Sequence, residues 1–140
     1  MSELGGSAFD FWLGEWDCSF EGGTATNSVT RGFDGHVMTE RFEAQTPQRW
    51  SGMSVSVYTE SQGLWRQTWV DQDGAYWHFV GSLVDGDPSF GTPDPVDTER
   101  LFKRMIFSNI GPDAFDWRWQ SSPDGEDWTE NWAIAYRRRA

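Results

Sequence analysis

The stretch that decides the fold runs from residue 114 to residue 138 and reads AFDWRWQSSPDGEDWTENWAIAYRR. In its first part, aromatic side chains occupy every second position, at Phe115, Trp117 and Trp119, with polar side chains between them. Successive side chains of a strand point to opposite faces, so this period of two predicts a strand with one apolar face. After the SPDG turn the pattern returns, from Trp128 to Tyr136, and predicts the next strand.

The rest of the chain repeats this organisation. Short runs rich in Val, Thr, Trp, Phe and Tyr are separated by Gly, Asp, Asn and Pro at roughly ten-residue intervals, which is typical of an all-β meander, sandwich or barrel. We expect strands near Trp16–Glu21, Ala25–Phe33, His36–Ala44, Ser51–Thr59, Leu64–Asp71, Ala75–Val84, Leu101–Ser108, Ala114–Ser121 and Thr129–Arg138.

Two kinds of connection separate these strands. Asp-Gly pairs such as Asp34-Gly35 and Asp73-Gly74 supply the positive φ angles of tight hairpins, so each strand should pair with the next in sequence. Residues 85–99 differ because they hold Pro88, Pro93 and Pro95, and proline is excluded from central strands. We expect a long surface loop there.

A barrel is the arrangement that leaves no open edge. An open meander of about nine strands would expose two unpaired edges, a hazard that closure removes. We therefore predict an all-β, antiparallel up-and-down barrel of about nine to ten strands, with a short N-terminal helix over Ser7–Leu13 capped by Ser7. A two-sheet sandwich is the alternative. The length of 140 residues suits one domain, residues 1–140.

The composition limits the kinds of partner that the protein can bind. A net charge of -11 argues against nucleic-acid or anionic-membrane binding, because both need a basic surface. No run of about 18 apolar residues exists, and the first residues lack a basic region followed by an apolar one, so we expect no membrane span and no signal peptide. The single cysteine, Cys18, is expected to be a buried small hydrophobe. These features predict a cytoplasmic protein. We expect a monomer or a homodimer, a choice that the sequence leaves open.

The segment FDFWLGEW at residues 9–16 resembles the opening of lipocalin-like (calycin) barrels. In such barrels a short helix precedes a Gly-x-Trp motif at the start of the first strand. The resemblance implies that Trp16 closes the narrow end, with an arginine of the last strand packed over it. Arg137, Arg138 and Arg139 are the candidates, and a guanidinium over an indole face is a favourable cation–π contact.

The whole chain is more closely similar to a bacterial family of small lipocalin-like proteins of unknown function. The likeness rests on the FWLGEW opening, on LWRQTWVD at residues 64–71 followed by a glycine turn, on the SPDG hairpin with Trp128, and on the terminal YRR at residues 136–138. It is weakest over residues 82–100. The family implies a barrel and a pocket, without a known reaction.

Several polar residues stand on aromatic faces. Glu40 shares a face with Met38 and Phe42. Gln67 lies between Trp65 and Trp69 on its predicted strand face, and Glu130 lies between Trp128 and Trp132 on the face of the last predicted strand. A buried polar group needs a partner, and a buried carboxyl has a raised pKa that suits proton transfer. We expect the pocket to be lined by Met38, Glu40, Phe42, Gln67, Trp69, Trp77, Trp117, Trp119 and Trp132.

The signals for catalysis and for cofactors are weaker. Glu40, Glu130 and His78 are the candidate general acids or bases. Neither His36 nor His78 belongs to a metal-binding motif, so we expect no metal site, although one histidine would suffice to ligate a haem. The turn at Asp73-Gly74 leaves two registers open, a two-residue turn or a three-residue turn starting at Gln72, and these exchange Trp77 and His78 between cavity and surface.

The pattern supports two functions. The first is binding of a small hydrophobic, aromatic or polycyclic molecule in the cavity, because small barrels either fill with side chains or hold one such ligand. The second is an enzyme on the same barrel, a cyclase, isomerase or lyase of a hydrophobic metabolite. A barrel filled with side chains, acting as a partner-binding domain, is the third reading.

Overall fold

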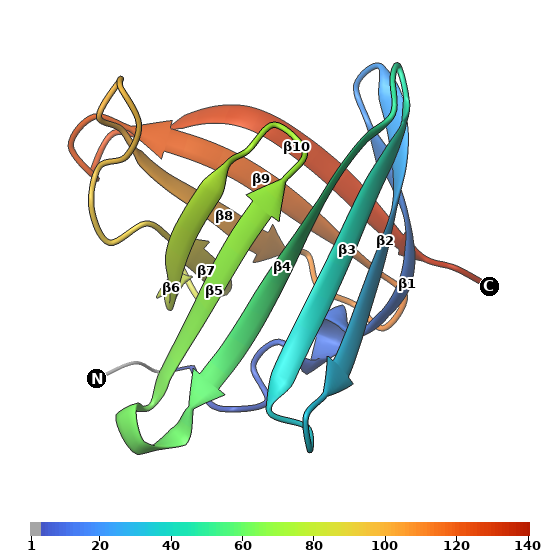
Figure 1. Cartoon of the computed structure of the whole chain (residues 1–140), viewed down its shortest axis with the longest axis horizontal. Coiled ribbons are helices and arrows are strands. Elements are labelled where there is room, and N and C mark those ends of the chain that lie inside the picture. The colour runs from blue at the N-terminus through green and yellow to red at the C-terminus, as the bar shows by residue number, and fades with distance from the viewer. Residues whose placement is uncertain (1–3) are drawn as a thin grey trace.

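Ten antiparallel strands close on themselves in sequence order in the computed structural model, which describes residues 4–140 (Figure 1). Each strand pairs with the next, and β10 pairs with β1, so every edge of the sheet is satisfied. Two 3-10 turns accompany the strands, η1 (Asp10–Trp12) and η2 (Glu60–Gln62). The strands are β1 (Gly14–Phe20), β2 (Gly23–Gly32), β3 (Val37–Thr46), β4 (Trp50–Thr59), β5 (Leu64–Asp71), β6 (Tyr76–Val84), β7 (Asp87–Gly91), β8 (Phe102–Ser108), β9 (Ala114–Ser122) and β10 (Thr129–Arg138).

The predicted all-β barrel is confirmed, and the sandwich alternative is excluded by the closed pairing. The nine expected strands are all present, with ends that differ from prediction by at most two residues. Residues 1–3 lie outside the described residues. They belong to the predicted domain and to the segment in which we expected no signal peptide.

The expected surface loop over residues 85–99 was wrong in its first part, where β7 forms. Pro88 is tolerated because it is the second residue of the strand, opposite Leu83, and β8 pairs only with the residues that follow it. Phe90 anchors β7 to the core, since it is fully buried and its ring stacks on Phe9 at a centroid distance of 4.6 Å.

The predicted helix over Ser7–Leu13 was also wrong. Only the three residues of η1 are helical, and they form a 3-10 turn whose start carries no side-chain cap, so Ser7 does not cap it. Three aromatic side chains of this short stretch, Phe9, Phe11 and Trp12, pack against rings of other strands. We attribute the irregular backbone to this packing, because tertiary contacts override a weak local helix preference.

An aromatic cluster around Phe9 and Trp12 closes the end of the barrel beside η1. The Arg138 guanidinium lies over the Trp16 ring, 4.3 Å from its centroid, and donates to the carbonyl oxygen of Leu13 at 2.9 Å. Of the three candidate arginines, Arg138 therefore covers the tryptophan, as the resemblance implied.

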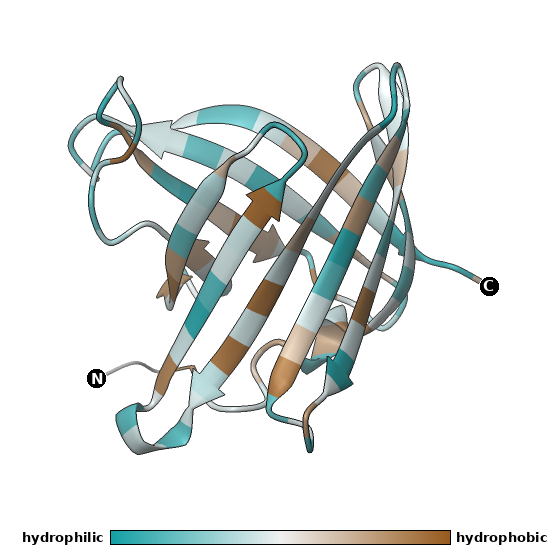
Figure 2. Ribbon diagram, viewed as in Figure 1, coloured by the Kyte–Doolittle hydropathy of each residue, from teal (hydrophilic) through white to brown (hydrophobic). Residues whose placement is uncertain are grey.

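The strands carry alternating bands of apolar and polar residues (Figure 2). In β5 the inward side chains include Trp65 and Gln67, both buried, whereas Arg66 between them is exposed. This alternation places one face of each strand in the interior and positions the polar side chains of that face next to aromatic rings.

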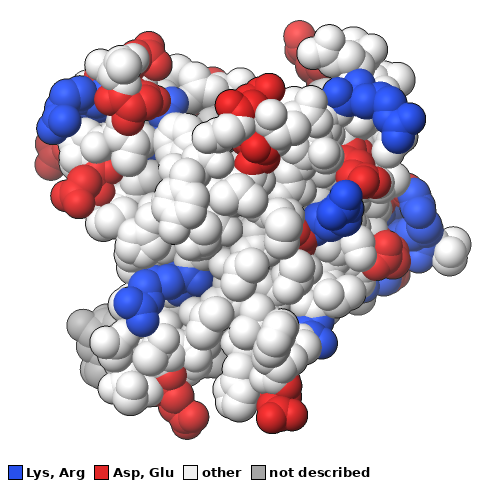
Figure 3. Space-filling view, viewed as in Figure 1, with Lys and Arg blue, Asp and Glu red and all other residues white. Residues whose placement is uncertain are grey.

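One face of the barrel carries its charged side chains mainly toward its margins. On the face that covers β3 to β6, acidic and basic side chains gather near the edges and the centre is largely uncharged (Figure 3). Among residues 4–140, no helix combines the length and apolar character needed to cross a bilayer.

Candidate ligand-binding cavity

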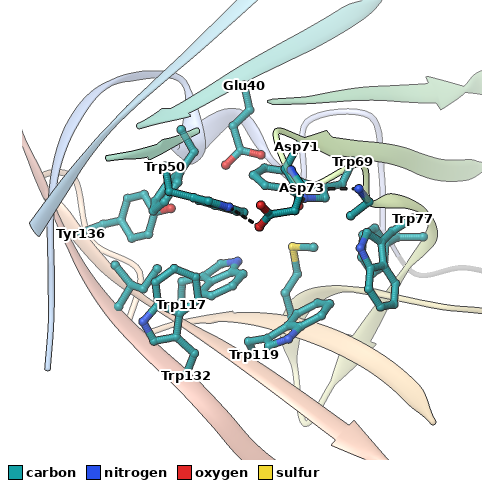
Figure 4. A pocket seen from close by; sticks show the side chains of 15 residues that line it. Glu40, Trp50, Trp69, Asp71, Asp73, Trp77, Trp117, Trp119, Trp132 and Tyr136 are labelled. Atoms are coloured by element: carbon teal, nitrogen blue, oxygen red, sulfur yellow. Dashed lines mark hydrogen bonds between the residues drawn. The ribbon is translucent and has the colours of Figure 1, made fainter. Parts of the chain in front are cut away.

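A cavity of about 310 Å³ lies next to the turn between β5 and β6 (Figure 4). This turn is at the end of the barrel opposite η1 (Figure 1). The size of the cavity lies at the lower limit of small-molecule sites, about 300–1,000 Å³. Most of its wall is aromatic. The lining residues are Glu40, Phe42, Trp50, Trp69, Asp71, Asp73, Ala75, Trp77, Phe79, Met105, Trp117, Trp119, Trp132, Ile134 and Tyr136.

The tryptophan rings of the cavity wall form parallel and perpendicular pairs. The rings of Trp117 and Trp119 are parallel within 2°, with centroids 6.1 Å apart, because they are next-but-one neighbours on β9. Trp132 stands perpendicular to Trp117, and Trp77 stands perpendicular to Trp119. The cavity therefore offers both ring faces and ring edges to a guest.

Seven of the nine residues predicted to line the pocket do so: Glu40, Phe42, Trp69, Trp77, Trp117, Trp119 and Trp132. Met38 and Gln67 point inward but belong to the packed interior and not to the lining. Gln67 is 1% exposed, and its amide donates to Ser56 Oγ at 2.9 Å. On the inward face of its strand, Met38 is next to Glu40 and Gln67 is next to Trp69, and both of these neighbours line the cavity. The prediction therefore identified the correct face of each strand but extended the cavity too far into the barrel.

The pairing register of β5 and β6 decides whether Trp77 or His78 faces the cavity. Trp69 pairs with Trp77, which is the register of a three-residue turn starting at Gln72. Asp71 Oδ1 fixes this turn by accepting from the backbone N–H groups of Asp73 at 2.9 Å and Ala75 at 3.3 Å. Trp77 consequently lines the cavity, and the candidate acid or base His78 is exposed on the outer face.

Glu130 also lies outside the cavity. A β-bulge falls between Glu130 and Trp132, so the two residues no longer share a face as simple alternation predicts. The Glu130 carboxylate is exposed and lies 3.5 Å from Arg118 Nη1 on the outer surface. Its placement gives no support to a catalytic role in the cavity.

Glu40 is the candidate acid or base that does reach the interior. Its carboxylate accepts from Asn27 Nδ2 at 2.8 Å and from Ser54 Oγ at 2.7 Å. Both donors are neutral. Burial raises the pKa of Glu40 above its ordinary value, and the two hydrogen bonds oppose that shift only in part.

The polar group around Glu40 continues to β1 and β10. Asn27 Nδ2 also donates to Tyr136 Oη at 2.9 Å, and Tyr136 pairs with Cys18 across the sheet. Burial raises the pKa of Tyr136 well above its usual range and that of Cys18 to about 12. Both groups are thus neutral at ordinary pH, and the expectation that Cys18 is buried is confirmed.

The mouth of the cavity carries two more carboxylates (Figure 4). The Trp50 indole N–H donates to Asp73 Oδ2 at 2.8 Å, and the Trp69 indole N–H donates to Asp71 Oδ2 at 2.9 Å. These indoles stack on each other with centroids 6.0 Å apart. Sequence reasoning missed Trp50, Asp71 and Asp73, although Asp71 continues the inward alternation of Trp65, Gln67 and Trp69.

The positions of the histidines, the cysteine and the carboxylates bear on metal and haem binding. Within residues 4–140, no three His, Cys, Asp or Glu side chains are grouped so that they could hold a metal ion. His36 and His78 are both exposed and neither lines the cavity. Neither histidine can therefore ligate a haem held in the cavity.

The fold and the cavity define a closed, ten-stranded antiparallel β-barrel with an internal aromatic cavity, an architecture compatible with a lipocalin-like fold. Comparison with known proteins adds no closer assignment: no protein-family model matches the chain, and no curated protein matches it significantly.

Proposed function

We propose that this protein binds a small, flat, mainly apolar molecule inside the barrel. The observation that carries the proposal is a cavity of about 310 Å³ walled by tryptophans at the end of an otherwise packed interior. Large rings supply contact area at a low cost in conformational entropy, which favours planar and aromatic guests.

Two further assignments belong to this proposal. The Gly-x-Trp opening and the Arg138 guanidinium over Trp16 support membership of the small bacterial lipocalin-like family that the sequence resembles. A cytoplasmic location fits the single cysteine, Cys18, which is buried and free.

Native mass spectrometry of the purified protein, together with tryptophan-fluorescence titration against flat apolar metabolites and haem, tests the binding function. A co-purified mass or saturable quenching supports it. Absence of both across the panel would contradict it and favour a barrel that serves a protein partner.

Two adjacent residues of β6 provide matched variants. Trp77 lines the cavity, whereas Tyr76 points outward and is 73% exposed. Trp77→Ala should weaken binding about tenfold through loss of an aromatic contact, and Tyr76→Ala should leave the affinity unchanged. Equal effects of the two changes would place the bound molecule outside the cavity.

Catalysis in the same cavity is the second candidate function, and Glu40 is the observation that favours it. A carboxyl with a raised pKa facing a bound guest can donate or accept a proton. Mass spectrometry of the guest after prolonged incubation distinguishes the two functions. An enzyme converts the guest and loses conversion in Glu40→Gln, whereas a binding protein returns the guest unchanged.

A further inference from the structure

We propose that the guest is an organic cation, a flat aromatic group bearing a protonated amine, with Glu40 as the buried counter-ion. This inference rests on the proposed binding function and specifies the chemistry of the ligand. Two observations support it: the charged side chains that line the cavity are all acidic, and the indole N–H groups of Trp50 and Trp69 are already hydrogen-bonded.

The charged side chains of the lining all have the same sign. Glu40 lies in the interior, and Asp71 and Asp73 lie at the mouth, while no Lys, Arg or His is among the lining residues. Among residues 4–140, the ion pairs join other side chains, so none neutralises Glu40. An anionic guest would meet three carboxylates without a compensating cation.

Glu40 is 8% exposed and faces the cavity, yet it contacts only neutral donors, Asn27 and Ser54 (Figure 4). Each carboxylate oxygen accepts one bond from these donors and can accept another. A buried carboxylate without a counter-ion is costly, and a guest ammonium group would supply both the opposite charge and further hydrogen bonds.

The aromatic wall favours the same sign of charge. The indole N–H groups of Trp50 and Trp69 are engaged by Asp73 and Asp71, so these two side chains present ring faces and edges to the cavity. The faces of aromatic rings attract cations, most strongly when the cation is removed from water. Aromatic faces and carboxylates together form a site for a cation with an apolar body.

Three compounds of nearly equal size test the proposal: 2-naphthylmethylamine, 2-naphthylmethanol and 2-naphthoate. They differ in carrying a positive charge, no charge or a negative charge. Isothermal titration calorimetry near neutral pH should show the amine binding at least about tenfold more tightly than the alcohol, and the carboxylate binding most weakly.

Glu40→Gln should bring the amine to within about twofold of the alcohol, because the neutral amide no longer balances the ammonium charge. Glu43→Gln is the matched control. It lies three residues further along the same strand, on the outer face beside Arg41, and should retain the full preference for the amine. A preference that survives Glu40→Gln overturns the assignment of Glu40.

The wild-type protein supplies a measurement that does not depend on how well a variant folds. The titratable groups near Glu40 are Cys18 and Tyr136, with Asp71 and Asp73 also lining the cavity. The thiol and the phenol stay neutral at ordinary pH, so the amine-to-alcohol affinity ratio should rise with pH as Glu40 loses its proton.

The outcomes separate the two proposals. Equal affinities for the amine and the alcohol, or a ratio that does not change with pH, overturn the cationic guest and leave the binding function standing. Absence of binding by all three compounds overturns both proposals, because each compound carries a flat apolar body that the cavity would accept.

Discussion

The side-chain amide nitrogen of Asn27 lies 2.8 Å from Glu40 Oε2 in the interior of the barrel, and both residues are more than nine-tenths buried. A neutral amide thus holds a carboxyl group that has no basic partner. The same nitrogen donates to Tyr136, so one side chain links three strands, β2, β3 and β10.

Asn27→Ala should destabilise the protein by about 1–3 kcal/mol, because it removes the buried donor that Glu40 Oε2 and Tyr136 Oη share and leaves Ser54 as the remaining donor to Glu40. Chemical denaturation near neutral pH measures the change in the free energy of unfolding. In a double-mutant cycle with Glu40→Gln, the coupling between the two positions should be at least about 0.5 kcal/mol. Purely additive effects would show that the hydrogen bond contributes nothing to stability.

The raised pKa of Glu40 predicts how stability depends on pH. The unfolded chain loses the Glu40 proton near the ordinary carboxyl pKa, whereas the folded protein retains it to higher pH. The stability associated with this group is therefore complete below the ordinary value and is lost as pH rises through the raised value. The slope can reach about 1.4 kcal/mol per pH unit.

Denaturation at a series of pH values checks this dependence with two variants. Glu40→Gln should remove the Glu40 contribution to the decline, so that its stability relative to wild type improves as pH rises. Glu43→Gln should follow the wild-type curve, since its side chain lies on the outer face of β3. Parallel curves for wild type and Glu40→Gln would contradict the assignment.

Arg138 should contribute more to stability than its neighbour Arg139. Arg138 covers the Trp16 ring and donates to the carbonyl oxygens of Leu13 and Pro112. Arg138→Ala should cost about 2 kcal/mol and lower Tm, because a cation–π contact and hydrogen bonds to backbone acceptors are lost together.

Arg139→Ala is the control for that experiment. Arg139 pairs with Asp17 on the surface, where water and salt screen the interaction, so its replacement should change Tm little. A loss in Arg139→Ala as large as that in Arg138→Ala would indicate that general charge, and not closure over Trp16, stabilises this end.

Gly52 makes room for the Trp69 indole at the mouth of the cavity. A methyl group at this position would lie 2.6 Å from Trp69 Cη2, so Gly52→Ala should displace the ring. We expect a cost of about 1–3 kcal/mol from overpacking and a weaker affinity for the guest, measured by denaturation and calorimetry.

Gly111→Ala is the matched change. A methyl group there would meet Ala114 O at 3.8 Å, an ordinary contact, so both stability and guest affinity should stay close to wild type. If Gly52→Ala bound the guest as tightly as wild type, Trp69 would be excluded as part of the functional wall.

The alternation of residue types along the chain was sufficient to predict the fold and most of the expected cavity-lining residues. Alternation over Phe115, Trp117 and Trp119 identifies an inward face, because side chains on a strand must alternate. That rule also placed Glu40 and Phe42 on one face, and both line the cavity. It failed on β10, where the bulge after Glu130 inserts one residue and reverses the alternation.

The sequence by itself determined that the chain forms an antiparallel meander, and which side chains of most strands share a face, since both follow from the period of two and from turn residues. Only the tertiary structure decided that β7 completes the barrel, that Trp77 and not His78 faces inward, and that Asn27 reaches both Glu40 and Tyr136. The physical reason is that register, closure and cavity depth depend on contacts between strands distant in sequence.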